Sequence, residues 1–390
     1  MDETTEIAIL GCGYVANMYR LTLGMHPELS LVGVFDRERS RAETMARLTG
    51  SRCYASLTEL LEDPRPRIVL NLTNPSEHYI TTRDLLEAGK HVYTEKPLAM
   101  HLGQARELAT LARERGLHLV AAPCTVMNPV AQTLWKALRD NVVGRVRLVH
   151  AAMEDGMVPR APVAKWINEA GVAWPAVDEY QTGCTVEHAG YVLTWLCAMF
   201  GPVTRLTAHA EELMPDKIPG IDLHPAPDFS VAVLRFETGV VARMTNGLYA
   251  DHDHALRIFG DDGVITVADP RSDTSAITVQ RYRTLRRRRF LSPMKRRVKP
   301  LGPREKITGY RGSQTRDFCR LLAQMAQAIR SGTAPYIDAD FALHITEVTL
   351  ACHFATHATN AVAGFDGALD QMPYEPASRF NPIQPLDWAT

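Results

Sequence analysis

The sequence predicts an α/β fold in which a doubly wound domain with a parallel sheet precedes an α+β domain with a mostly antiparallel sheet. From residue 6 to about residue 122, short apolar runs alternate with helical segments, which is typical of βαβ units. After Pro123 this rhythm ends, and from Thr204 onward several β-runs follow one another with short turn sequences between them. We therefore expect one domain over residues 1–123 and a second over residues 124–390.

The expected elements follow from apolar periodicity and from turn residues. Strands of the first domain are expected at residues 7–10, 31–36, 68–73, 91–93 and 118–121, and helices at residues 15–25, 40–49, 57–62, 78–88 and 102–115. Gly50, Gly89 and Gly116 directly follow three of these helices, where a left-handed glycine ends a helix. In the second domain we expect helices at residues 130–141, 185–200, 314–331 and 338–360, and strands at residues 146–152, 205–211, 230–237, 240–245, 255–259, 264–267 and 277–282.

Composition restricts the classes of protein to consider. At 390 residues and 46% hydrophobic, the chain can bury the cores of about two domains. No uninterrupted apolar stretch approaches the roughly 18–20 residues that span a bilayer, so we expect no membrane span. The first residues, MDETTEIAIL, are acidic where a secretory signal would be basic. The seven cysteines form no C-x-x-C pair, which favours reduced thiols, and we expect a cytoplasmic protein.

One segment carries most of the charge asymmetry. Residues 281–299 contain ten Arg or Lys and no acid, which leaves 33 of the 43 basic residues against 44 acidic residues elsewhere. A solvated loop is one interpretation. The other is a site for an anionic partner, such as a substrate diphosphate, a neighbouring subunit or an acidic membrane surface. Nucleic acid is not expected, because Tyr282 and Phe290 are the segment's only aromatic residues.

A glycine-rich turn lies between the first expected strand and the first expected helix. Gly11-Cys12-Gly13-Tyr14-Val15-Ala16 fits G-x-G-x-x-A, in which a bare backbone lets a pyrophosphate approach the helix N-terminus. Asp36 ends the second strand, at the distance typical of an acid that binds the adenine ribose hydroxyls. This pattern predicts a Rossmann domain that binds NAD. NADP stays possible, because Arg37 could bind a 2′-phosphate.

A lysine follows the fourth expected strand of this domain. Ligands of doubly wound domains bind outside the carboxyl ends of the strands, so Lys96 in Glu95-Lys96-Pro97 is placed where the nicotinamide should lie. By itself, a lysine after a strand is more often a surface charge.

Together with these motifs, Thr73-Asn74-Pro75-x-x-His78 and the domain order resemble the Gfo/Idh/MocA dehydrogenases. The resemblance implies an NAD(P)-dependent oxidoreductase that transfers a hydride to or from a secondary alcohol or ketone of a sugar, cyclitol or nucleotide-sugar. It implies that Lys96 is catalytic and that Thr73, Asn74, His78 and Glu95 lie near the cofactor. A helix-cap or core role for His78 is about as plausible. A homodimer or homotetramer is also implied, with the open sheet face of the second domain as a natural place for subunit pairing.

The second domain departs from the family pattern. Glu187 stands where the family usually has Asp, and Tyr191 where it usually has His. A phenol can transfer a proton, and Lys96 would stabilise its phenolate form, so Tyr191 is the preferred acid/base and Glu187 orients Lys96. His188, one residue out of the usual frame, is the alternative, and Trp166 could stack on a sugar ring. The competing interpretation is that the helix residues only pack the domain interface.

Two clusters suggest a metal ion, but we expect none. Cys184, Glu187 and His188 lack further ligands at the usual spacing. The segment Asp251-His252-Asp253-His254 stands at a strand entrance, where a solvated turn is more plausible.

Two rival functions stay open at this point. One is an elimination or epimerisation in which a tightly held NAD takes and returns the hydride. The other is a dinucleotide-binding protein without catalysis.

Overall fold

The computed structural model describes residues 4–302, 316–355 and 373–389. Its first part contains a six-stranded parallel sheet with the order β3-β2-β1-β4-β5-β6. The strands are β1 (Thr5–Leu10), β2 (Leu29–Phe35), β3 (Arg52–Cys53), β4 (Ile68–Asn71), β5 (His91–Thr94) and β6 (Leu119–Ala121). β1, at the centre, pairs in parallel with β2 and β4, so the carboxyl ends of the strands meet at one edge of the sheet. The predicted doubly wound fold is confirmed.

Helices connect these strands, and glycines end several of them. They are α1 (Ala16–Leu23), α2 (Arg39–Thr49), α3 (Leu57–Glu62), α4 (His78–Glu87) and α5 (Leu102–Glu114). Gly50, Gly89 and Gly116 have φ of 68°, 76° and 63°, the left-handed region that stops a helix. The predicted caps are therefore confirmed.

The second sheet has nine strands and is mostly antiparallel, as predicted. Its order is β14-β13-β12-β11-β7-β10-β9-β8, and β15 pairs with β13. The strands are β7 (Val146–Glu154), β8 (Val203–Glu211), β9 (Phe229–Phe236), β10 (Val241–Gly247), β11 (Leu256–Gly260), β12 (Gly263–Val267), β13 (Ile277–Leu285), β14 (Arg288–Leu291) and β15 (Arg296–Val298). β7 and β10 form a parallel pair.

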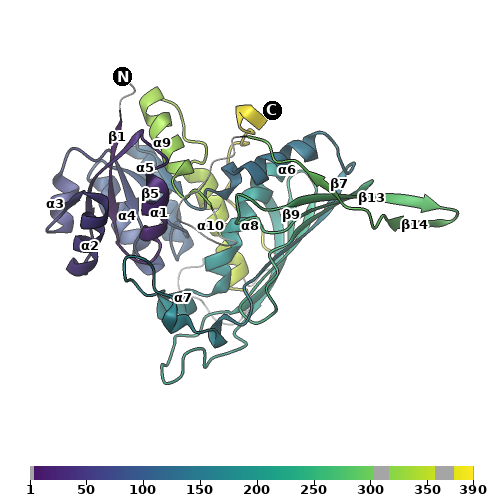
Figure 1. Cartoon of the computed structure of the whole chain (residues 1–390), viewed down its shortest axis with the longest axis horizontal. Coiled ribbons are helices and arrows are strands. Elements are labelled where there is room, and N and C mark those ends of the chain that lie inside the picture. Colours follow the sequence, from purple (N-terminus) through teal and green to yellow (C-terminus); the bar gives the residue numbers. More distant parts are fainter. Residues whose placement is uncertain (1–3, 303–315, 356–372, 390) are drawn as a thin grey trace.

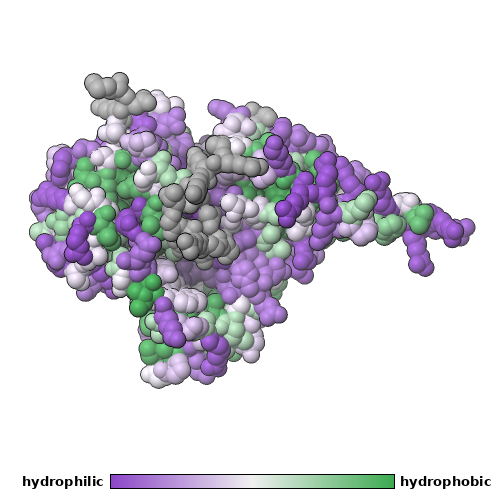
Figure 2. Space-filling model, viewed as in Figure 1, coloured by the Kyte–Doolittle hydropathy of each residue, from purple (hydrophilic) through white to green (hydrophobic). Residues whose placement is uncertain are grey.

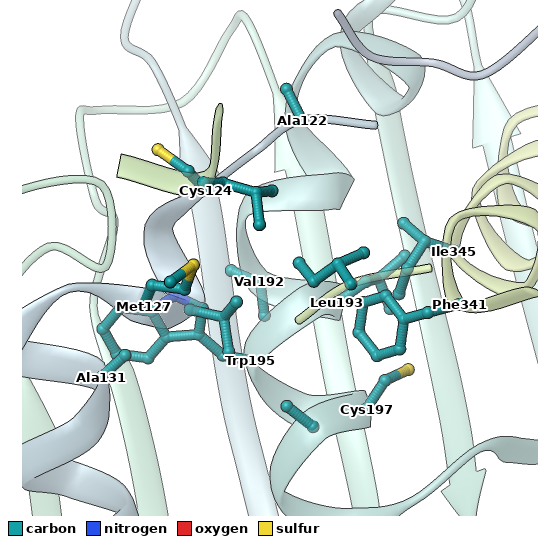
Figure 3. Close-up of a cluster of buried hydrophobic side chains, with 14 of the residues drawn as sticks. Ala122, Cys124, Met127, Ala131, Val192, Leu193, Trp195, Cys197, Phe341 and Ile345 are labelled. Atoms are coloured by element: carbon teal, nitrogen blue, oxygen red, sulfur yellow. The ribbon is translucent and has the colours of Figure 1, made fainter. Parts of the chain in front are cut away.

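Some helices of the second part pack on this sheet, and others lie beside the first sheet (Figure 1). The helices of the second part are α6 (Pro129–Arg139), α7 (Ala176–Thr182), α8 (Cys184–Phe200), α9 (Arg320–Ser331) and α10 (Ala339–His353). α8 contacts β7, β9 and β10 and is apolar almost all round, as a helix enclosed by other elements must be. Figure 3 shows this core, in which Trp195 of α8 lies near Met127, while Leu193 faces Phe341 of α10.

The last helices differ from their predicted bounds. α9 begins at Arg320 rather than at residue 314, because residues 316–319 are not helical; residues 314 and 315 lie outside the described ranges. α10 begins after Asp338, whose carboxylate accepts the N–H of Phe341 at 2.9 Å, and residues 356–360 also lie outside those ranges. α7 was not predicted.

The residues just before α9 pack against α1 of the first domain. Phe318 packs edge-to-face on Tyr19 of α1 with 5.5 Å between ring centroids, and Cys319 Sγ lies 3.4 Å from the Tyr19 carbonyl oxygen. Contacts therefore cross the expected division at residue 123, and the exact domain boundary stays a prediction.

The basic segment is a hairpin rather than the predicted loop. Residues 281–291 extend β13 and form β14, and this hairpin projects from the body as an exposed, hydrophilic arm (Figures 1 and 2). The prediction of a loop is wrong, because cross-strand pairs such as Arg283 with Phe290 satisfy the backbone although the charged sequence shows no alternation.

Within the described ranges, none of the helices is both long and apolar enough to cross a bilayer. The predicted subunit pairing through the open sheet face stays a prediction.

Replacing Trp195 tests the packing of α8. The side chain is fully buried, and its Nε1 donates to Thr125 Oγ1 at 3.1 Å. We expect Trp195→Ala to lower the free energy of unfolding by about 3–5 kcal/mol through the cavity that it leaves, as measured by chemical denaturation. Val233→Ala, at a half-exposed position of β9, should change it by less than about 0.5 kcal/mol. Equal losses in the two variants would contradict this packing.

Candidate active site

The main cavity lies at the carboxyl ends of the parallel strands, where the first sheet faces α7 and α8. Its volume is about 450 Å³, within the range of small-molecule sites. Most of the residues predicted for the site line it: Gly13, Tyr14, Val15, Thr73, Asn74, His78, Glu95, Lys96, Trp166, Glu187, His188 and Tyr191. Side chains from both sheets' domains thus converge on one space, as predicted.

The glycine-rich turn forms one wall of this cavity. Gly11 has φ of 93°, and a Cβ there would lie 2.7 Å from the backbone of Leu72, so this position needs glycine. A Cβ at Gly13 would meet nothing within 4 Å, because the backbone there borders open space. α1, which starts at Ala16, has no acid in its first turn and no side-chain cap, so its N-terminus is open to an anion. This cradle fits a dinucleotide pyrophosphate.

Asp36 lies beside the turn, directly after β2. Its carboxylate accepts the backbone N–H of Cys12 and of Glu38, both at 2.7 Å, and so fixes the loop. Carboxylate oxygens have further lone pairs with which to accept ribose hydroxyls. Arg37 points to solvent, 4.0 Å from Glu77.

His78 and its neighbours hold the loops that border the cavity. The fully buried His78 has Nδ1 2.7 Å from the carbonyl oxygen of Pro97 and Nε2 2.9 Å from that of Thr73. Burial lowers the pKa of this histidine. Asn74 donates to Asp178 at the start of α7 with 2.9 Å between Nδ2 and Oδ2. These residues position the loops after β4 and β5 against α7.

Lys96 follows β5 and forms an ion pair across the cavity with Glu187 of α8. Burial lowers the pKa of Lys96, but Glu187, together with the neighbouring Tyr191, Glu179 and Glu95, outweighs burial and raises it above its usual value. The ammonium therefore stays charged at neutral pH. Glu95 points away from this pair, since its Oε1 accepts the hydroxyl of Tyr19 at 2.6 Å.

Glu179 of α7 adds a second carboxyl group beside Glu187. Burial, and then the charge of Glu187, raise the pKa of Glu179 well above its usual value. A neutral Glu179 can donate a hydrogen bond, as a carboxylate cannot.

Tyr191 lies one helical turn after Glu187 on α8, as the spacing predicts. The side chain of Tyr191 is partly buried and lines the cavity. Arg316 places its guanidinium carbon 4.8 Å from the Tyr191 ring centroid. Tyr191 is thus near two cations, Lys96 and Arg316.

His188 is held by a carboxylate. Its Nδ1 lies 3.0 Å from Oδ2 of Asp155, the residue that follows β7. Burial lowers the pKa of His188 and outweighs the opposing effect of Asp155, so the imidazole is neutral at pH 7. A neutral imidazole carries its proton on one nitrogen and can accept one on the other.

The other oxygen of Asp155 connects to residues 254 and 271. Asp155 Oδ1 lies 3.0 Å from His254 Nε2 and 3.1 Å from Arg271 Nη1. Arg271 Nη2 also donates to His254 Nδ1 at 2.7 Å. The predicted solvated turn at residues 251–254 is therefore wrong for His254, which is buried between the charged groups of Asp155 and Arg271; residues 251–253 are exposed.

Asp155, His252 and His254 could bring one ligand atom each to within 4.8 Å of the others, the spacing of a metal site. The Arg271 guanidinium already supplies positive charge to this group and occupies the imidazole lone pair of His254. This donor set therefore does not fit a divalent cation.

Trp166 lines the cavity with about a third of its surface exposed and packs edge-to-face on Trp174 at 5.2 Å. The sequence did not indicate Asp155, Glu179, Arg271 or Arg316. Asp155 carried a weak signal, since an acid directly after a strand often borders a ligand. The other three come from loops and from a short helix that no periodicity marks.

Comparison with known proteins agrees with this geometry. Residues 5–122 match the family described as the Gfo/Idh/MocA oxidoreductase family with an NAD-binding Rossmann fold. Residues 131–266 match the Gfo/Idh/MocA C-terminal domain. The two matches together cover more than half of the chain.

Several individual proteins are similar to it. Trans-1,2-dihydrobenzene-1,2-diol dehydrogenase from Sus scrofa is 27% identical over 271 residues, which cover 67% of this chain and 73% of that one. The aldose-aldose oxidoreductase from Caulobacter crescentus superposes with a TM-score of 0.71 at 19% identity, covering 89% of this chain and 95% of that one. The WlbA dehydrogenase from Bordetella pertussis, solved with NADH and UDP-GlcNAcA, superposes with a TM-score of 0.66 at 16% identity, covering 90% and 95%. The chain belongs to the Gfo/Idh/MocA family and is an NAD(P)-dependent oxidoreductase of that type.

Proposed function

We propose that this oxidoreductase acts on a secondary alcohol or ketone of a sugar-like substrate, with Lys96, Glu187 and Tyr191 around the reacting oxygen. The observation that carries the proposal is the Lys96–Glu187 ion pair, with Tyr191 one turn along the same helix in the same cavity. When bound, the nicotinamide supplies or accepts the hydride. Gly13 and the first turn of α1 would hold its pyrophosphate, and Asp36 its adenine ribose.

Lys96 binds the reacting oxygen. Its ammonium donates to a ketone oxygen and stabilises the negative charge that develops there during reduction. Glu187 fixes the direction of the ammonium and keeps it charged. In alcohol oxidation the same contact holds the hydroxyl in place.

Tyr191 exchanges the proton of that oxygen. In oxidation its phenolate takes the proton from the hydroxyl, and in reduction the phenol returns it. The positive charges of Lys96 and Arg316 lie near Tyr191.

His188 is the second candidate for the proton exchange. Its Nδ1 lies 3.0 Å from Asp155, and a neutral ring has one nitrogen able to accept a proton. This arrangement is that of a histidine base with an orienting carboxylate.

The rest of the cavity suits a polyhydroxylated molecule. Asp178 and Glu179 provide oxygens that can bind hydroxyl groups, and Trp166 and Trp174 provide aromatic faces. Sugar-related names among the relatives, such as the aldose-aldose oxidoreductase, support the same substrate class.

Gly13→Ala tests the cofactor cradle. The added methyl group meets no protein atom, so thermal stability should be unchanged, but it fills space that the pyrophosphate needs. We expect NADH binding, followed by fluorescence, to weaken at least tenfold. Gly103→Ala is the matched control, because its Cβ also meets nothing and it lies on α5, outside the cavity. Unchanged NADH affinity in Gly13→Ala would contradict the cradle.

Lys96→Met tests the oxygen-binding role. We expect kcat to fall at least about a hundredfold while NADH binding stays within a few fold, measured by NADH absorbance over a panel of sugars and cyclitols. Lys295→Met, at an exposed position between β14 and β15, is the control and should keep full activity. Turnover that is unchanged in Lys96→Met would remove the lysine from the reaction. Wild-type conversion of a sugar without net change in NADH would favour epimerisation or elimination.

Two further variants separate the proton carriers. We expect Tyr191→Phe to lower kcat by about 10²–10⁴-fold and His188→Asn to lower it less than tenfold. Thermal denaturation first shows that both variants are folded. Their pH–rate profiles are then compared with that of the wild-type protein. The reverse order of effects would assign the proton exchange to His188 and Asp155.

A further inference from the structure

Arg316 is a buried cation that faces the same cavity. It lies in the loop that leads to α9, is 6% exposed, and lines the cavity together with Lys96 and Tyr191. Its guanidinium lies between two aromatic rings, with its central carbon 4.8 Å from the Tyr191 centroid and 4.5 Å from the Phe318 centroid. Both rings thus pack against the guanidinium.

Among the described residues, Arg316 has no carboxylate partner, unlike the other cations nearby. Lys96 pairs with Glu187, Arg271 with Asp155 at 3.1 Å, and Arg320 with Asp273 at 2.8 Å. The buried Nε of Arg316 has no hydrogen-bond acceptor within that part of the chain.

The one carboxylate among the main influences on the charge of Arg316 is already engaged. Glu95 affects the charge state of Arg316, but its Oε1 accepts the Tyr19 hydroxyl and its Oε2 accepts the N–H of Lys96 at 3.2 Å.

A buried arginine cannot lose its charge. Burial lowers the pKa of Arg316, but Tyr191 and other neighbours outweigh burial and raise it. A guanidinium in the interior therefore needs an anion or acceptors to offset its lost hydration. Because Arg316 borders the cavity, a ligand can supply that anion.

The geometry around Arg316 indicates which chemical group of a ligand would bind it. A guanidinium forms hydrogen bonds through its planar N–H edge, where Nε of Arg316 lacks a partner, and a planar carboxylate matches such an edge with two parallel hydrogen bonds. The cofactor pyrophosphate is expected at the first turn of α1. Arg316 instead contacts Tyr191, one turn from the residue that binds Lys96, which is the substrate end of the site.

From these contacts we propose that Arg316 binds a carboxylate of the substrate, so that the enzyme acts on a sugar acid rather than on a neutral sugar. This inference rests on the proposed function, because it assumes that the cavity takes a sugar-like substrate beside Lys96. Arg316 is thus the residue that determines specificity for the anion.

The test compares acids with neutral molecules of nearly the same shape. Isothermal titration of the protein–NADH complex is made with three pairs: gluconate and sorbitol, glucuronate and glucose, galacturonate and galactose. We expect at least one acid to bind tenfold or more tightly than its neutral partner, and Arg316→Gln to remove that difference. Arg316→Lys should keep part of it, because charge remains without the planar fork. Arg243→Gln, at an exposed position of β10, is the control and should keep all of it.

Three results would overturn the proposal, and each differs from failure of the cofactor site. The first is that no acid binds the wild-type complex more tightly than its neutral partner. The second is that Arg316→Gln weakens NADH binding as much as acid binding, which would assign Arg316 to the cofactor. The third is that Arg316→Gln shifts the pH–rate profile but leaves the acid preference intact, which would make it a counter-ion of Tyr191 alone. Failure of the wild-type protein to bind NADH would instead contradict the proposed function itself.

Discussion

The ion pair between Lys96 and Glu187 is the interaction on which the site depends. It joins the loop after β5 to the first turn of α8, so it connects the parallel sheet with the helix that covers the second sheet. Both partners are largely buried, and the carboxylate is the main one of several groups that offset the effect of burial on the lysine. Breaking one partner of such a pair leaves an uncompensated buried charge, which is strongly unfavourable. The pair therefore fixes where the two halves of the cavity meet.

Electrostatics divides the cavity into parts with different tasks. The N-terminus of α1 is open to an anion, whereas Glu179, Glu187 and Asp155 lie on the opposite wall. His188 stays neutral because burial outweighs its carboxylate partner. Together these groups favour the phosphate of a cofactor at one end of the cavity and the hydroxyl groups of a substrate at the other. An anionic group of the substrate would lie near Arg316.

Sequence reasoning succeeded where the determinants are local. The glycine turn, Asp36 and Glu95-Lys96-Pro97 follow strands whose apolar periodicity is clear, and the structure brings them to one edge of the sheet. It failed where partners are distant in sequence. His254 is buried only because Asp155 and Arg271 meet it there, and the basic arm shows no alternation because most of its side chains on either face are solvated. Arg316 lies in a loop, and only the folded chain places it between Tyr191 and Phe318.

The most direct measurement of the central claim is a double-mutant cycle on kcat/KM with Lys96→Met, Glu187→Gln and the double variant. If Glu187 acts through Lys96, Glu187→Gln alone should lower kcat/KM at least tenfold. Added to Lys96→Met, the same substitution should change kcat/KM by less than about twofold. Losses that multiply independently in the double variant would show that the two residues act separately. In that case the ion pair would not be the element that organises the site.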